Sequence, residues 1–239
     1  MIKLITASER HQANVGDWLK SHYLFSFADH YDPSNMEFGP LRVFNDDYIS
    51  PKAGFPAHPH TEIEIVTIVL SGELTHKDNI GNQATISPGQ VQRMTAGTGM
   101  THSESNETDE EVHLLQLWFV PNQRNLAPSY ELMQVDFLST KNKLTPLVTG
   151  QKVLEDVVFL NSNSTVYYGS VDQGEEINFR TFKIRKTLLY LLSGSLLVNN
   201  VEADIHDQVR LDDQELVTIR GTSSATFILV DVPALEVNY

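Results

Sequence analysis

Two short segments of the sequence could together hold a metal ion. His58-Pro59-His60 and His102-Ser103-Glu104 each place two ligand-type side chains at positions i and i+2. In a β-strand, residues at this spacing point to the same face of the sheet. Two neighbouring strands that each carry one such pair would therefore direct four ligands toward one point.

The residue types of this set indicate which metals it suits. Imidazole and carboxylate groups bind borderline first-row ions, so Fe(II), Mn, Co, Ni, Cu and Zn all fit and are not distinguished. Four protein ligands leave two positions of an octahedral ion open to water, a chelating substrate or dioxygen. The chain has no cysteine, which excludes thiolate ligands, disulfides and cysteine nucleophiles. The sequence predicts one transition-metal site, with the ligands His58, His60, His102 and Glu104.

Residues near the two pairs carry further expectations. Glu62 and Glu64 share the strand parity of His58 and His60 if the strand continues, so either could reach the metal or orient one of its ligands. Of these alternatives, we expect Glu64 to orient a ligand and Glu62 to face solvent. Pro59 cannot donate to a strand ladder, so we expect the first pair at a sheet edge or bulge, near an opening. Six other histidines show no pairing and are interpreted as surface or hydrogen-bonded residues: His11, His22, His30, His76, His113 and His206.

The elements that must position these groups are predicted to be strands. Short β-branched or aromatic runs alternate with turn residues, which is typical of an all-β sandwich or barrel. Helical periodicity is weak, and only 16–22 is expected to form a short helix, while 130–138 is a candidate strand. The clearest strand-length runs are 41–44, 63–70, 91–94, 112–120, 187–192, 215–219 and 226–232.

An internal repeat predicts two similar β units. Val69-Leu70-Ser71-Gly72 matches Leu191-Leu192-Ser193-Gly194, an offset of 194 − 72 = 122 residues. The irregular stretch 121–150 is expected to connect the units, which gives domains at 1–130 and 131–239. The same offset aligns the four ligands with Arg180, Phe182, Ser224 and Thr226. None of these is a good transition-metal ligand, so we expect the second domain to contain no metal.

Bulk properties exclude several classes of function. The 239 residues suffice for one large domain or two small ones. A net charge of -14 argues against direct nucleic-acid binding. The first residues contain no apolar targeting segment, and no apolar run approaches the roughly 20 residues that span a bilayer. We therefore expect a cytoplasmic protein that does not contact membranes.

An ordered series of motifs extends across about residues 17–120 and includes both ligand pairs. The series resembles the pirin family of the cupin superfamily, in particular its compact bacterial branch. Its main segments are Phe25-Ser26-Phe27-Ala28-Asp29, Phe38-Gly39-Pro40-Leu41-Arg42-Val43, Phe55-Pro56-Ala57-His58-Pro59-His60, His76-Lys77-Asp78, Met94-Thr95-Ala96-Gly97-Thr98-Gly99 and His102-Ser103-Glu104. One departure is Ile63, which stands where the family often has an aromatic residue.

The resemblance implies a bicupin fold, with two tandem jelly-roll barrels and one metal, most often iron as Fe(II), in the N-terminal cupin. In the family the carboxylate ligand comes from the second motif, which favours Glu104 over Glu64. Some bacterial members are quercetin 2,3-dioxygenases, which open the flavonol ring with dioxygen and release carbon monoxide; Glu104 would then also be the catalytic proton acceptor. The alternative is a metal-binding regulatory or redox-sensing protein that acts through a protein partner. A cavity beside His60 and Glu104 would favour the enzyme, and a closed site the regulator.

Overall fold

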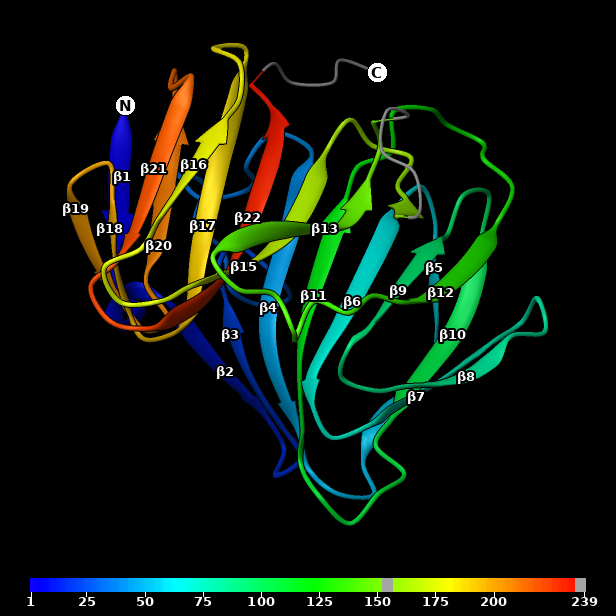
Figure 1. Ribbon diagram of the computed structural model, residues 1–239. Coiled ribbons are helices and arrows are strands. Elements are labelled where there is room, and N and C mark those ends of the chain that lie inside the picture. The colour runs from blue at the N-terminus through cyan, green and yellow to red at the C-terminus, as the bar shows by residue number, and fades with distance from the viewer. Residues whose placement is uncertain (152–156, 235–239) are drawn as a thin grey trace. The chain divides into compact units, whose positions relative to one another are not determined.

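A computed structural model describes residues 1–151 and 157–234 (Figure 1). The chain divides into two compact units that interleave along the sequence. Unit 1 comprises Met1–Arg10, Phe137–Val157 and Asn163–Tyr239, and unit 2 comprises His11–Asp136 and Val158–Ser162. The first ten residues thus belong with the C-terminal half, and the sequence boundary at 130/131 stays a prediction.

Unit 2 contains two antiparallel sheets. The larger runs in the order β12-β9-β6-β11-β4-β3-β2 and the smaller in the order β5-β10-β7-β8. Its strands are β2 (His11–Val15), β3 (Leu19–Tyr23), β4 (Leu41–Ile49), β5 (Gly54–His60), β6 (Glu64–Ser71), β7 (Leu74–Asp78), β8 (Gln83–Ile86), β9 (Gln90–Thr95), β10 (Met100–Ser105), β11 (Val112–Phe119), β12 (Ser129–Gln134) and β14 (Val158–Phe159).

Unit 1 repeats this layout. Its larger sheet contains the order β1-β20-β17-β22-β15-β13, and its smaller sheet has the order β16-β21-β18-β19. The elements are β1 (Ile2–Ile5), the 3₁₀ turn η1 (Ala7–Glu9), β13 (Lys143–Thr149), β15 (Thr165–Val171), β16 (Glu176–Arg180), β17 (Arg185–Ser193), β18 (Ser195–Val198), β19 (Val201–Asp204), β20 (Gln208–Asp212), β21 (Leu216–Gly221) and β22 (Ala225–Pro233).

The two Ser-Gly turns occupy matching places in the two units. Gly72 and Gly194 lie just before β7 and β18 and have φ angles of 74° and 77°, a left-handed conformation that glycine adopts without strain. The repeat in the sequence therefore corresponds to a repeat in topology. Within the described residues, no helix has the length and apolarity needed to cross a membrane.

Each unit buries its core between its two sheets. In unit 2, Leu74 and Ile86 of the smaller sheet pack with Val69, Val112 and Leu114 of the larger one. β6 is buried from Glu64 to Val69, which suits its place between β9 and β11 and explains its nearly continuous apolar sequence. A corresponding cluster fills unit 1.

The helix predicted for 16–22 is wrong. Leu19–Tyr23 forms β3, which pairs with β2 on one side and β4 on the other. Leu19, Ser21 and Tyr23 are buried while Lys20 is exposed, and this period of two marks a strand. The strand expected at 130–138 exists but ends earlier, as β12 pairs with β9 only to Gln134.

Candidate metal centre

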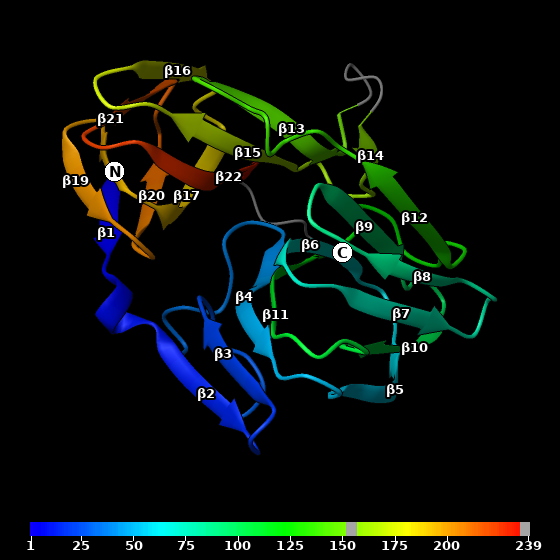
Figure 2. The ribbon, with the colours of Figure 1, turned by 60° about the horizontal axis from the view of Figure 1, so that its bottom comes forward.

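The two ligand pairs lie on neighbouring antiparallel strands of unit 2. β5 carries His58 and His60, and β10 carries His102 and Glu104, with His102 opposite His58. β5 is the edge strand of the smaller sheet, as expected from Pro59, and Figure 2 shows it beside β10. The pairing of β5 with β10 thus brings together residues about 44 positions apart in the chain. The i, i+2 spacing places both ligands of each strand on one face of the sheet.

A bulge in β5 sets the position opposite the carboxylate residue. The register shifts between His102 and Glu104, so Glu104 lies opposite Phe55. Gly54 permits this close pairing, because a Cβ atom at that position would lie 2.3 Å from the carbonyl oxygen of Glu104. A side chain at position 54 would therefore push β5 away from β10.

The three histidines converge. Ring centroids are 4.5 Å apart for His58 and His102, 4.8 Å for His58 and His60, and 5.0 Å for His60 and His102. One nitrogen from each ring can be chosen so that all three lie within 4.8 Å of one another. This spacing allows one ion to contact all three rings.

Several buried polar atoms at this point lack a hydrogen-bond partner within the described chain. They are His60 Nε2, His102 Nε2 and Glu104 Oε1. Leaving such an atom unpaired costs about 1–3 kcal/mol, a cost that a bound cation removes. The Nδ1 atom of His58 lies 2.8 Å from the carbonyl oxygen of Pro56, so Nδ1–H donates there and Nε2 keeps its lone pair. The donor set therefore fits a metal ion.

The protonation of the rings suits ligation. Burial, and then the neighbouring histidines, lower the pKa of His60 to about 4 and that of His102 to about 3. Both imidazoles are neutral at neutral pH, which is the form that binds metal.

A chain of hydrogen bonds orients Glu104. Gln116 Nε2 donates to Glu104 Oε2 at 2.8 Å, and Trp118 Nε1 donates to Gln116 Oε1 at 3.0 Å. The Trp118 ring also meets His60 edge-on, with centroids 4.9 Å apart. β11 thus supports both a carboxylate and an imidazole of the cluster.

His76 was missed by the sequence analysis. It is fully buried on β7, and its Nδ1 lies 3.5 Å from His102 Nδ1 while its Nε2 lies 3.2 Å from Asp78 Oδ2. With His102 and Glu104 it forms a second group of potential ligands. His76 is hydrogen-bonded, as one of the two interpretations expected, but its contact with His102 was not predicted. The signal was present, since His76 and Asp78 are a third i, i+2 pair.

The parity argument for Glu62 and Glu64 is also wrong. β5 ends at His60 and β6 begins at Glu64 in the other sheet, with Glu62 at a φ of 52° between them. Glu64 is buried and accepts hydrogen bonds from the Asn161 backbone at 3.0 Å and side chain at 3.2 Å, rather than orienting a ligand. Glu62 is half-buried and accepts the N–H of Asn125 at 3.1 Å.

A cavity of about 240 Å³ opens beside the cluster, within unit 2. Its walls combine His58, His60 and Glu104 with aromatic rings and a few polar groups. Neighbouring rings contact edge-on, with centroids 5.1 Å apart for Tyr23 and Phe27 and 5.3 Å for Phe27 and Trp118. The other lining residues are Val15, Leu19, Ser21, Ala28, Asn45, Asp47, Phe55 and Gln116.

Asp47 in the cavity wall makes stability depend on pH. Burial raises the pKa of Asp47 to about 7, although the hydrogen bond that Ser21 donates acts to lower it. Because an unfolded Asp titrates near 3.9, the folded state holds the extra proton and loses stability as pH rises from about 4 to about 7. We expect Asp47→Asn to raise the free energy of unfolding by about 2–4 kcal/mol at pH 8 and by little at pH 3.

Urea denaturation at the two pH values measures this gain. The matched control is Asp109→Asn, because the Asp109 side chain is 91% exposed and should show no such gain. An equal effect of Asp47→Asn at both pH values would contradict the assignment.

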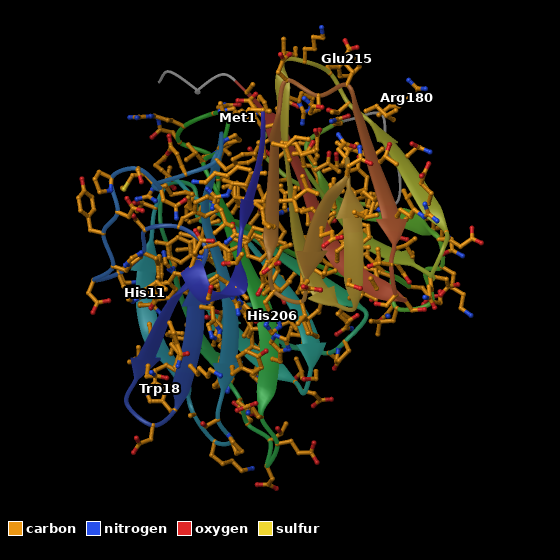
Figure 3. All side chains as sticks on the ribbon, turned by 90° about the vertical axis from the view of Figure 1, so that its left-hand side faces the viewer. Met1, His11, Trp18, Arg180, His206 and Glu215 are labelled. Carbon is orange, nitrogen blue, oxygen red and sulfur yellow. The ribbon has the colours of Figure 1, made fainter. Side chains whose placement is uncertain are left out.

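The corresponding positions of unit 1 differ from those that the constant offset gave. Arg180, at the end of β16, pairs with Leu216, and Figure 3 shows Arg180 and Glu215 at the same end of this unit. In unit 2 the equivalent pair is His60, at the end of β5, with Met100 on β10. Residues of β16 therefore stand 120 positions after their equivalents on β5, and residues of β21 stand 116 positions after their equivalents on β10. Ser224 and Thr226 lie beyond β21 and are not equivalent to the ligands. The equivalents are Asn178, Arg180, Thr218 and Arg220.

Comparison with known proteins gives matches to both units. Residues 6–119 match the Pirin family model, and residues 147–232 match the model of the Quercetinase C-terminal cupin domain. The chain is 35% identical to Quercetin 2,3-dioxygenase of Escherichia coli K12 over 98% of this chain and 99% of that one. It is 36% identical to the Pirin-like protein of Caulobacter vibrioides over 90% and 92%.

Solved structures agree with these matches. Bacterial pirin YhhW from Escherichia coli, in complex with nickel(II), superposes with a TM-score of 0.92 and 33% identity, covering 98% of this chain and 100% of that one. The bicupin fold expected from the sequence is thereby confirmed.

Proposed function

Since this chain belongs to the pirin family, we propose that it is a metal-dependent dioxygenase that opens the ring of a flavonol such as quercetin with dioxygen. Its relatives include proteins named quercetin 2,3-dioxygenase in Escherichia coli. The observation that carries the proposal is the set of unpartnered ligand atoms beside the cavity.

The metal is proposed to be held by His58, His60, His102 and Glu104. The unpaired atoms His60 Nε2, His102 Nε2 and Glu104 Oε1 support this assignment. We propose Fe(II) as the native ion, while the nickel(II) complex of the Escherichia coli pirin supports a site that accepts several divalent ions. When bound, the ion supplies Lewis acidity toward the substrate oxygen and a redox partner for dioxygen.

The cavity walls suit a flat phenolic substrate. Tyr23, Phe27, Phe55 and Trp118 present aromatic surface that would pack against the substrate rings and exclude water. Glu104 Oε1 has two lone pairs and no hydrogen-bond partner within the described residues, so one lone pair would bind the metal and the other would accept the proton of the flavonol 3-hydroxyl. Gln116 holds Oε2 throughout, so the carboxylate keeps its orientation.

A closed site without a cavity would support the alternative, a regulatory or redox-sensing metal protein that acts through a partner. The cavity includes His58, His60 and Glu104 in its wall and leaves room for a small molecule. This arrangement supports an enzyme over a purely structural metal site.

Oxygen admission to metal-loaded protein tests the proposal. Metal-free protein is loaded anaerobically with Fe(II), Mn, Co, Ni, Cu or Zn, mixed with quercetin and then exposed to dioxygen. The expected result is loss of flavonol absorbance with dioxygen uptake and carbon monoxide release in the Fe(II) sample, and none in the metal-free control. Unchanged absorbance with every metal would sink the proposed activity.

A further inference from the structure

His76 and Asp78, neither of which is a proposed ligand, lie directly behind His102. β7 carries both, and the register places Asp78 opposite His102 and His76 opposite Glu104. The side chains of His76 and Asp78 are fully buried, and Tyr130 stacks on the His76 ring with centroids 4.8 Å apart. Water is thus kept from the hydrogen bonds that link these groups.

Asp78 acts only as an acceptor. Its Oδ1 accepts the backbone N–H groups of Ile80 at 3.1 Å and Asn82 at 2.9 Å, and its Oδ2 accepts the Asn82 amide at 2.8 Å. The remaining contact of Oδ2 is His76 Nε2 at 3.2 Å. A carboxylate has no hydrogen to give, so His76 Nε2 must carry the hydrogen and donate it.

The tautomer of one ring then fixes that of the next. A neutral His76 that donates from Nε2 has a lone pair on Nδ1. That Nδ1 lies 3.5 Å from His102 Nδ1, and a hydrogen bond between them requires His102 to donate from Nδ1. The lone pair of His102 is consequently on Nε2, which is the buried atom without a partner among the described residues.

We propose that Asp78 and His76 form a hydrogen-bonded relay that fixes His102 in the tautomer whose Nε2 lone pair faces the metal site. This inference rests on the proposed metal site but not on the proposed reaction. His76 and Asp78 are positioning residues, since both act through His102. His58 is fixed in the same tautomer by the Pro56 carbonyl, so two ligands of the set are oriented by different means.

Nitrogen-15 spectra of the histidine rings test the relay directly. In metal-free protein, long-range proton–nitrogen correlations should show His102 protonated on Nδ1 and His76 protonated on Nε2. In Asp78→Asn the new amide can donate to His76 Nε2, which reverses both tautomers and lowers metal affinity by about 10–100-fold. The matched control is Asp46→Asn, which alters the other His–Asp pair, His113 Nε2 to Asp46 Oδ1 at 2.6 Å, and should leave His102 unchanged.

A pair of substitutions at His76 separates orientation from folding. The amide oxygen of His76→Asn can accept the bond from His102 Nδ1, so metal affinity should stay within roughly threefold of wild type, whereas His76→Leu should lose about 10–100-fold. His102 protonated on Nε2 in the wild type overturns the relay. So does full metal affinity in His76→Leu, or loss of metal in His76→Asn as complete as in His102→Ala, since His76 would then be a ligand. A protein that shows the relay and binds metal but leaves quercetin intact contradicts only the proposed reaction.

Discussion

His102→Ala is expected to remove the metal from the protein. Both groups of potential ligands include His102, so its loss breaks each of them and leaves His58, His60 and Glu104. Metal content after dialysis should fall from about one ion per chain to less than roughly a tenth, because alanine supplies no donor atom and only two of the three converging imidazoles remain. Elemental analysis of protein purified without added chelator measures the change.

His30→Ala is the matched control for this loss. His30 lies in the same unit, stacks on His11 with centroids 4.0 Å apart, and belongs to neither group of potential ligands. Metal content in this variant should equal that of the wild type. Full metal occupancy in His102→Ala would mean that the ligand set is assigned wrongly.

Glu104→Gln is expected to abolish most of the activity while leaving metal in place. Three imidazoles remain, but the amide cannot accept the hydroxyl proton of the substrate. General-base catalysis contributes about 10²–10⁴-fold, so kcat for flavonol loss should fall by that factor. The rate is compared at equal metal occupancy, which separates proton transfer from ligation.

Glu107→Gln makes the same chemical change outside the site. Its carboxylate is exposed and pairs with Lys77 at 3.1 Å. The rate should stay within about twofold of wild type, as is usual for surface substitutions. A Glu104→Gln variant with similarly unchanged kcat would show that Glu104 is not the proton acceptor.

Local patterns predicted much of the fold. The runs 41–44, 112–120 and 187–192 lie within or largely coincide with β4, β11 and β17, because buried strands need apolar residues wherever they pack. The stretch 16–22 does not read as a strand because three consecutive polar residues, Lys20, Ser21 and His22, interrupt the apolar–polar alternation. β3 is held in the sheet by pairing with β4, a segment further along the chain. The local pattern of residues 16–22 contains no information about that partner.

The candidate site was predictable only strand by strand. The spacing of His58 with His60, and of His102 with Glu104, is local and could be recognised. Which strand pairs with which is set by tertiary packing, so His76 on the third strand was overlooked. Glu64 was misplaced for the opposite reason, since the turn at Glu62 separates two segments that read as one strand.

The placement of β1 has a consequence for biosynthesis. β1 completes the larger sheet of unit 1 by pairing with β20, and Ala7 contacts Asp207, 200 residues further along the chain. During translation β1 therefore leaves the ribosome long before its partner exists. Most strands of unit 2 are synthesised in the meantime and can pair with one another. The edge of β1 stays unpaired until β20 is synthesised, near the end of translation. Contacts of such long separation are slow to form and leave nascent chains open to mispairing.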